Sequence, residues 1–303
     1  MALCGGEVSP ELKQKLEQEL ARLLPSGSKL ERRLFDYYLL VFSWCLAQTK
    51  EIRAARPGAV VLGVNGPQGA GKTTLTRCLV PLFDQAGLHA VSVSIDDFYL
   101  THAAQVELAA RFPTNPYLRQ RGYPGTHDVA LGAAVIEELR SLGAGDVAAV
   151  PVYDKALHDG RGDRLPRSAW RRIVGPVDIV LFEGWMLGFP PVAEAKLGGD
   201  SALVAVNRLL AVYEPWRTAL DAMVQLRMAD AGFVVRWRVE AEAVLRSEGR
   251  GALSPAAARA YVEQFLPAYM AYPAELERCP PQPGRHLVIC LGEDRLPLTN
   301  WSP

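Results

Sequence analysis

The sequence lacks an excess of charge of either sign, because its 33 Lys and Arg residues are matched by 33 Asp and Glu residues. A neutral chain has no basic field for binding nucleic acids or an anionic membrane surface, so the sequence predicts neither partner. The longest apolar run, residues 37–47, is interrupted by Ser43 and is too short to cross a bilayer. No charged segment followed by an apolar core stands near the N-terminus, so we expect no secretory signal.

Cysteine and histidine are also scarce, with five residues of each. The cysteines are scattered, odd in number and never spaced as C-x-x-C, so we expect reduced thiols, a cytoplasmic location and no zinc site. Four of the histidines show no metal-binding spacing either. The cysteines are Cys4, Cys45, Cys78, Cys279 and Cys290, and the four histidines are His89, His102, His158 and His286.

The most informative feature that is present is a glycine-rich loop between an apolar run and a helical pattern. Residues 66–73 satisfy the pattern G-x-x-x-x-G-K-[ST]. In this motif backbone N–H groups surround a polyphosphate, the Lys reaches the β- and γ-phosphates, and the Thr hydroxyl binds Mg²⁺. The alternative is a purely structural glycine turn, but strand and helix patterns flank the loop as the motif requires. The predicted nucleotide-binding residues are Gly66, Pro67, Gln68, Gly69, Ala70, Gly71, Lys72, Thr73 and Thr74.

Strand and helix patterns alternate along the chain, which predicts an α/β fold built from parallel βαβ units. Beyond the strand that precedes the loop, strands are expected at residues 90–95, 178–182, 222–226 and 286–291, and a short strand or extended segment at residues 147–153. Helices are expected at residues 29–56, 72–86, 100–112, 130–142, 203–220, 233–247 and 255–265. Residues 154–172 are predicted to be a charged loop, and residues 273–283 a Pro-rich surface connection.

Residues 1–57 carry no motif and are predicted to form a helical extension to a main domain of residues 58–303. Ser9 as N-cap predicts a first helix over residues 9–24. The following helix, residues 29–56, has apolar residues at spacings of three and four, which gives it an apolar stripe. We expect this stripe to pack on the main domain, and the alternative is a helix pair that binds a partner.

Acidic residues follow two of the predicted strands. Asp96 and Asp97 stand at the carboxyl end of strand 90–95, where open α/β sheets bind ligands. Asp96 is placed to accept a proton from an attacking hydroxyl or to hold Mg²⁺ through water, whereas Asp97 also fits a helix N-cap. Glu183 closes the apolar strand 178–182, which is the Walker-B arrangement of a carboxylate directed at the water shell of a metal ion.

The segment between strand 90–95 and strand 178–182 is rich in Arg, His, Tyr and Asp. Such a composition suits a pocket for a small anionic or hydroxylated molecule, because Arg binds a carboxylate through two parallel hydrogen bonds. The N-K-x-D motif with which G proteins read a base is absent. The phosphate loop, the strand-end carboxylates and this segment together indicate phosphoryl transfer to a small molecule.

Four longer strings are more distinctive than the loop: residues 94–101, residues 121–128, residues 153–155 with 160–164, and residues 182–189. They resemble the uridine kinase, phosphoribulokinase and pantothenate kinase superfamily, and within it the plant and cyanobacterial type of D-glycerate 3-kinase. The similarity covers about residues 58–293. It implies a P-loop kinase with a three-layer α/β/α fold, a central parallel sheet and a helical lid at about residues 230–255.

The resemblance also implies a reaction, the ATP-dependent and Mg²⁺-dependent phosphorylation of D-glycerate at its 3-hydroxyl to give 3-phospho-D-glycerate and ADP. Asp96 stands where the superfamily's proposed catalytic base stands. The arginine of the lid is expected to be Arg238, in preference to Arg236 or Arg246. The predicted catalytic residues are thus Lys72, Asp96 and Arg238. The predicted metal-facing residues are Thr73, Asp96 and Glu183.

The resemblance leaves the acceptor contacts open, because acceptors within the superfamily differ in size and charge. For the carboxylate clamp the candidates are Arg121, Arg161 and Arg164, with Lys155 as a further one. Two rival functions are a kinase of the same fold for a nucleoside or pantothenate, and a non-catalytic ATP-binding regulator. The predicted acceptor-binding residues are Tyr99, Arg121, His127, Asp128, Tyr153, Lys155, Arg161 and Arg164.

Overall fold

The computed structural model describes residues 10–11, 14–15, 18–19, 29–247 and 253–298. Most of the helix predicted over residues 9–24 lies outside the described residues. Across the described part, no helix is both long enough and apolar enough to cross a membrane.

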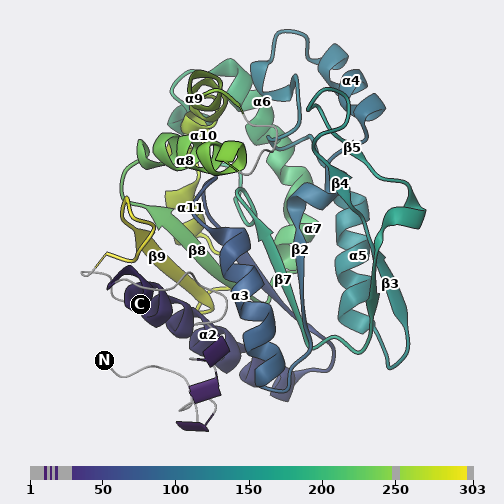
Figure 1. The fold of residues 1–303 in the computed structure, drawn as a ribbon. Helices are drawn as coiled ribbons and strands as arrows, with labels where there is room; N and C mark the ends of the chain where they lie inside the picture. The colour runs from purple at the N-terminus through teal and green to yellow at the C-terminus, as the bar shows by residue number, and fades with distance from the viewer. Residues whose placement is uncertain (1–9, 12–13, 16–17, 20–28, 248–252, 299–303) are drawn as a thin grey trace.

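The fold is organised around a five-stranded parallel sheet with the strand order β2-β7-β1-β8-β9 (Figure 1). Every residue of β1 and β7 is buried, as expected for parallel strands that have helices on both faces. The register pairs Val64 and Ser94 with Glu183, so β1, β2 and β7 present their carboxyl ends at one edge of the sheet. The strands are β1 (Val60–Asn65), β2 (Ala90–Ser94), β7 (Ile179–Gly184), β8 (Ala222–Met228) and β9 (His286–Leu291).

Helices cover both faces of this sheet, which confirms the predicted three-layer α/β/α architecture (Figure 1). Helices α2 (Lys29–Ala55) and α3 (Lys72–Gln85) lie on one face, and α5 (Val129–Ser141) and α7 (Glu214–Thr218) lie on the other. The other helices are α4 (His102–Arg111), α6 (Ser201–Leu209), α8 (Phe233–Ser247), α9 (Pro255–Glu263), α10 (Leu266–Ala271) and α11 (Pro273–Arg278). Short 3-10 helices occur as η1 (Ile95–Phe98), η2 (Pro116–Leu118), η3 (Arg167–Ala169), η4 (Glu194–Leu197) and η5 (Leu210–Tyr213).

The apolar stripe of α2 packs on the sheet and on α3. Val41, Phe42 and Cys45 have no exposed surface and belong to the same hydrophobic core as β1. Phe42 lies against Phe83 of α3, with their ring centroids 5.1 Å apart. The stripe is therefore covered by the rest of this chain, as expected from its spacing.

The structure refines one of the predicted segments and corrects two. The short strand or extended segment expected at residues 147–153 contains β3 (Val147–Val150), which pairs with β6 (Arg171–Val174). The segment expected to be a charged loop contains a second antiparallel pair, β4 (Tyr153–Asp154) with β5 (Asp163–Arg164). The segment expected to be a Pro-rich connection begins with helix α11, because a Pro in the first turn needs no hydrogen bond from its missing N–H.

Gly132 of α5 packs directly against Trp216 of α7, and this contact makes a counterintuitive prediction. A Cβ atom at residue 132 would lie 2.6 Å from Trp216 Nε1, and Trp216 is buried with Nε1 donating to the carbonyl oxygen of Val129 (3.0 Å). Gly132→Ala would normally stabilise a helix by about 0.5–1 kcal/mol, but overpacking costs about 1–3 kcal/mol. We therefore expect net destabilisation, measured as a lower urea midpoint. Ala130→Gly, on the exposed side of α5, reports the propensity effect alone, and a stabilised Gly132→Ala would contradict the packing argument.

Candidate active site

The glycine-rich loop joins β1 to α3 through a backbone conformation that suits glycine. Gly69 has a φ angle of 79° and Gly71 one of 89°, in the left-handed region that other residues avoid. Gly71 is also the N-cap of α3, and no side chain in the described part of the chain caps this helix end. The N–H groups of the first helical turn have no partner within the helix, so they and the positive end of α3 can bind an anion.

Lys72 lies at the start of α3 and folds back over the loop. Its Nζ donates hydrogen bonds to the carbonyl oxygens of Gly66 (2.8 Å) and Pro67 (3.1 Å). Burial lowers the pKa of Lys72, and the carboxylates of Glu183 and Asp96 act in the opposite direction. The ammonium group therefore lies in the same site as both acidic residues that were predicted from the strand ends.

Glu183 approaches the loop from the neighbouring strand β7. The predicted strand ended at residue 182, whereas β7 continues to Gly184. Glu183 is therefore the last residue but one of the strand itself. The Thr73 hydroxyl donates to Glu183 Oε1 at 3.0 Å, and Glu183 is buried with 6% of its surface exposed. A hydroxyl and a carboxylate side by side are the oxygen ligands that Mg²⁺ prefers beside a bound triphosphate.

Asp96 follows β2 in a tight turn whose backbone is fixed by its neighbours. The Ser94 hydroxyl accepts from the N–H of Asp96 (3.3 Å), and the Asp97 carboxylate accepts from the N–H of Ser94 (3.3 Å). This reciprocal pair is a capping box. Ser94 is thus the N-cap of η1, and Asp97 supports the turn from within it, so that the carboxylate of Asp96 has no part in the cap.

The carboxylate of Asp96 is engaged by Lys155, which follows β4. Lys155 Nζ donates to Asp96 Oδ2 at 2.5 Å, and 57% of the Lys155 side chain is exposed against 30% of Asp96. Burial alone would raise the pKa of Asp96, but the Lys155 ammonium, His127 and a hydrogen bond from Tyr99 lower it to about 2. Asp96 is therefore ionised at neutral pH and carries a cation as its partner.

Aromatic rings form the wall beside Asp96. The rings of Tyr99 and His127 stack with centroids 4.4 Å apart, and Tyr153 meets Tyr99 edge-on at 5.3 Å. The Tyr213 hydroxyl lies 2.9 Å from Nδ1 of His127. Burial lowers the pKa of His127 to about 3, although Asp96 opposes this shift, so the imidazole is neutral. His127 is a buried part of the wall.

Two of the three arginines considered for the acceptor are bonded to this wall. Arg121 donates to the carbonyl oxygens of Gly160 (2.8 Å) and Arg161, and its guanidinium lies 5.7 Å from the centroid of the Tyr153 ring. It thereby ties the hairpin between β4 and β5 to the wall. Arg161 itself is exposed on the same hairpin.

Arg164 is more deeply enclosed, with 12% of its side chain exposed. It donates to the Asp128 carboxylate (3.1 Å) and to the carbonyl oxygen of Tyr99 (2.8 Å). Asp128 in turn caps α5 by accepting from the N–H of Leu131 (3.1 Å). Arg164 and Asp128 therefore join β5, η1 and α5 behind the aromatic wall.

Helix α8 supplies the arginines of the predicted lid. Arg238 pairs with the buried Glu242 at 2.5 Å, and its guanidinium lies 4.9 Å from the centroid of the Tyr261 ring. Arg236 pairs with Glu293 at the surface. The pKa of Lys155 is raised by Asp96 foremost and also by Tyr261 of α9, the residue whose ring Arg238 contacts. Tyr261 was missed from the sequence, since no local pattern connects it to Asp96.

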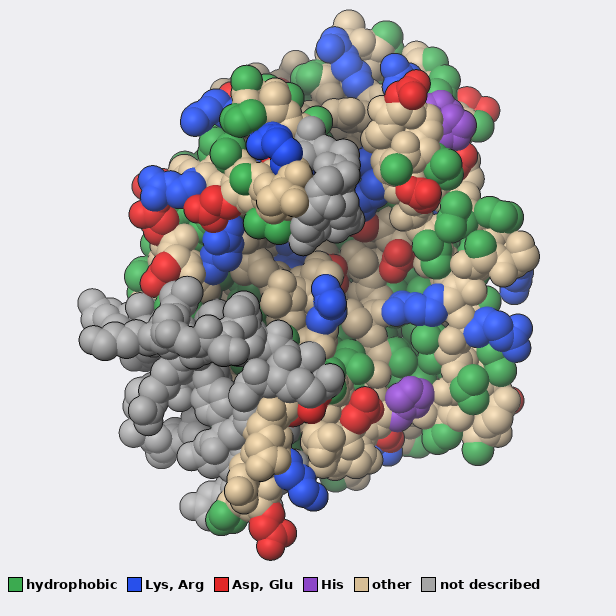
Figure 2. Space-filling model, viewed as in Figure 1, with side chains coloured by type: hydrophobic (Ala, Val, Ile, Leu, Met, Phe, Trp, Pro, Cys, Tyr) green, Lys and Arg blue, Asp and Glu red, His purple; other side chains and the backbone are tan. Residues whose placement is uncertain are grey.

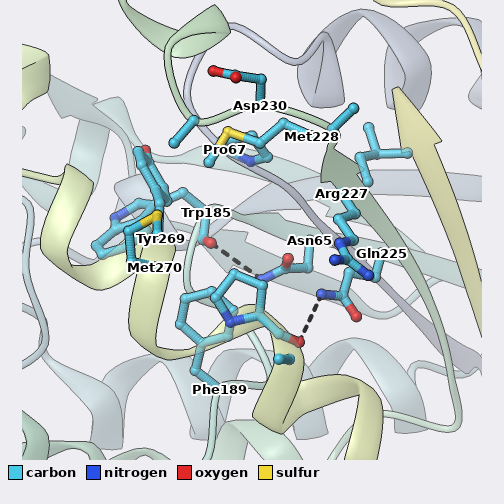
Figure 3. A pocket seen from close by; sticks show the side chains of 15 residues that line it. Asn65, Pro67, Trp185, Phe189, Gln225, Arg227, Met228, Asp230, Tyr269 and Met270 are labelled. Atoms are coloured by element: carbon cyan, nitrogen blue, oxygen red, sulfur yellow. Dashed lines mark hydrogen bonds between the residues drawn. The ribbon is translucent and has the colours of Figure 1, made fainter. Parts of the chain in front are cut away.

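The face in Figure 2 is hollowed between α8 and the part that carries the β4–β5 hairpin, with acidic and basic side chains inside the hollow. A cavity of about 430 Å³ is lined in part by Pro67 of the phosphate loop (Figure 3). It is lined by Trp185, Tyr269 and the amide of Asn65, which donates to the carbonyl oxygen of Trp185 (3.1 Å). Of the predicted site residues only Pro67 lines this cavity.

Tyr269 of α10 is a second contact that the sequence did not indicate. Its hydroxyl accepts from the backbone N–H of Gln68 at 3.1 Å, across 201 residues of chain. Tyr269→Phe removes this acceptor, and because such a bond contributes about 0.5–1.5 kcal/mol, we expect the KM for nucleotide to rise about 2- to 10-fold. The measurement is steady-state kinetics against ATP. Tyr272→Phe is the matched control, since the buried Tyr272 hydroxyl has no partner among the described residues, and equal effects of the two variants would contradict the role of Tyr269.

Comparison with known proteins places this geometry in a family. Residues 61–190 match the model of the phosphoribulokinase / uridine kinase family. The chain is 36% identical to the chloroplastic D-glycerate 3-kinase of Arabidopsis thaliana over 98% of its own length and 71% of that protein. It is 35% identical to an uncharacterized kinase of Schizosaccharomyces pombe, covering 78% of this chain and 90% of that protein. The D-glycerate 3-kinase structure from Cryptococcus neoformans var. grubii superposes with a TM-score of 0.79 at 29% identity, covering 90% of this chain and 98% of that one.

Proposed function

Because the chain belongs to the phosphoribulokinase and uridine kinase family, within the group that contains D-glycerate 3-kinase, we propose that it phosphorylates D-glycerate. The γ-phosphoryl group of ATP is transferred to the 3-hydroxyl, giving 3-phospho-D-glycerate and ADP. The observation that carries this proposal is the pair of Asp96 and Lys155 beside the phosphate loop. It supplies a carboxylate for the hydroxyl proton and a cation for the acceptor's own carboxylate.

Each part of the site has a role in this reaction. The loop N–H groups and Lys72 hold the β- and γ-phosphates, so that the γ-phosphorus faces the crevice near Asp96. Asp96 accepts the proton of the attacking hydroxyl as the new O–P bond forms. The bond to the β–γ bridging oxygen then breaks, and its electron pair leaves with ADP.

Thr73, Glu183 and Asp96 are the residues that would hold Mg²⁺, which fits the adjacent hydroxyl and carboxylate oxygens of Thr73 and Glu183. When bound with ATP, the ion neutralises charge on the β- and γ-phosphate oxygens. Arg238 is proposed to leave Glu242 and to close over the transferring group with α8, which excludes water. We also propose that Mg²⁺ is the metal ion that the reaction requires and that the protein is located in the cytoplasm. The cysteines among the described residues are free thiols, which supports that location.

The test is an acceptor panel with purified protein, ATP and Mg²⁺. The panel contains D-glycerate, L-glycerate, uridine, pantothenate and ribulose 5-phosphate; turnover is measured as ADP release, and the product from D-glycerate is identified as 3-phosphoglycerate. We expect D-glycerate to give by far the highest kcat/KM. Turnover of a different acceptor would replace the substrate in this proposal, and ATP binding without any acceptor-stimulated ADP release would support the non-catalytic regulator.

A further inference from the structure

The cations around the predicted acceptor site differ in how they are bonded. The guanidinium of Arg121 is held by two carbonyl oxygens of the hairpin, and that of Arg164 by Asp128 and a carbonyl oxygen. Arg161 is exposed on the same hairpin. Lys155 alone among these four places its charge on Asp96.

The contact between Lys155 and Asp96 has the properties of an exchangeable pair. It is a single hydrogen bond from a flexible ammonium, without the two-pronged geometry of an arginine fork. More than half of the Lys155 side chain is exposed, so water already competes with the carboxylate for this cation. An incoming carboxylate can therefore take the place of Asp96 as the partner, because the exposed ammonium then exchanges one anionic partner for another and stays paired.

The same contact affects what Asp96 can do as a base. A carboxylate oxygen that accepts from Lys155 presents less of its charge to a water molecule or to an alcohol. While the acceptor site is empty, Asp96 is therefore a poor base toward water. Once Lys155 turns to another anion, Oδ2 becomes available for a hydroxyl proton. This arrangement links the arrival of an anionic acceptor to the release of the base.

We propose that Lys155 is an exchangeable counter-ion, which pairs with Asp96 in the empty enzyme and transfers to the carboxylate of the acceptor when it binds. The proposal rests on the proposed function and identifies the residue that selects an acid over a neutral alcohol. In the loaded site the hydroxyl proton passes to Asp96 Oδ2, the hydroxyl oxygen bonds to the γ-phosphorus, and ADP leaves with the electron pair of the broken bond. In the empty site the pair suppresses the same transfer to water.

The experiment compares D-glycerate with D-glyceramide, a neutral analogue of nearly the same shape, and measures ATP hydrolysis without acceptor. In Lys155→Met we expect kcat/KM for D-glycerate to fall about 100-fold and that for D-glyceramide to change less than about threefold, while the basal hydrolysis rises several-fold. Lys155→Arg keeps the charge and should restore most of the preference for the acid. The matched control is Lys196→Met. The Lys196 side chain is exposed to a similar extent (55%), and its carboxylate partner is Glu275 instead of Asp96.

The outcomes separate this proposal from the function on which it rests. If the unaltered enzyme does not phosphorylate D-glycerate, the proposed function fails. If it does, and Lys155→Met keeps the wild-type ratio between acid and amide with unchanged basal hydrolysis, the counter-ion proposal is wrong. A loss of activity that is equal for both acceptors would assign Lys155 to transition-state stabilisation, and this would also overturn the proposal.

Discussion

Asp96→Asn is expected to lower kcat for D-glycerate by about 10²- to 10⁴-fold, which is the range that a positioned general base contributes. An amide has nearly the shape of the carboxylate but cannot accept the hydroxyl proton. The backbone beneath residue 96 should stay in place, because the turn is fixed by Ser94 and Asp97. We therefore expect the affinity for ATP to change by less than about threefold. Steady-state kinetics and a calorimetric titration with ATP measure the two quantities.

The adjacent carboxylate provides the control. Asp97 supports the capping box by accepting from the N–H of Ser94, and burial raises the pKa of Asp97 to about 6, opposed by that hydrogen bond. Asp97→Asn keeps an acceptor at this position, so kcat should remain within a few-fold of the unaltered enzyme. If Asp96→Asn retained a tenth or more of kcat, Asp96 would not be the base, and a larger loss in Asp97→Asn would reverse the two assignments.

The nucleotide half of the site could be predicted from the sequence because its determinants are local. The phosphate loop and the turn after β2 each follow a strand directly, and Glu183 lies at the carboxyl end of β7 itself. Parallel strands bring such ends to one edge, so three separate patterns predict one site. The structure places Lys72, Asp96 and Glu183 together as this rule requires. Their catalytic and metal-binding roles stay predictions.

For the acceptor half of the site, the sequence showed only that one segment is rich in Arg, His, Tyr and Asp, and not which of these side chains face the acceptor. Strands β4 and β5 have two residues each and consist of charged and polar residues with one tyrosine, so no alternation of apolar residues marks them. Whether an arginine in this segment faces a ligand or a carbonyl oxygen depends on how the hairpin lies on η1. From the sequence, Arg121, Arg164 and Lys155 were comparable candidates for binding the acceptor carboxylate. Only the structure shows that their hydrogen-bond partners differ.

Contacts between distant segments were not accessible to sequence reasoning. Tyr261, Tyr269 and Tyr213 reach the site from helices whose local patterns explain them fully as core residues. Helix α11, in contrast, did carry a signal, because Pro273 is followed by Ala, Glu and Leu, which favour a helix. The division into an extension of residues 1–57 and a main domain stays a prediction, although the α2 stripe shares the core of the sheet.

Lys72→Met is expected to lower kcat by about 10²- to 10³-fold, the loss that follows removal of one preorganised charge or donor from a developing anion. Lys72 bonds to the carbonyl oxygens of Gly66 and Pro67 in the empty loop, and its charge lies near Asp96 and Glu183. A bound triphosphate offers stronger partners than these carbonyls. Methionine keeps the apolar stem and removes only the ammonium. We expect the KM for ATP to rise less than kcat falls, because the loop N–H groups still bind the phosphates.

Lys50→Met on the exposed side of α2 controls for the loss of a positive charge at a distance from the loop. The combination of Lys72→Met with Asp96→Asn tests whether the two residues act on one step. If Asp96 removes the proton while Lys72 stabilises the same transition state, the double variant should lose little more than the worse single variant, because residues that act as a unit are not additive. Fully multiplicative losses in kcat would instead mean that Lys72 and Asp96 lower the barrier independently, and a rise in the KM for ATP with unchanged kcat would restrict Lys72 to nucleotide binding.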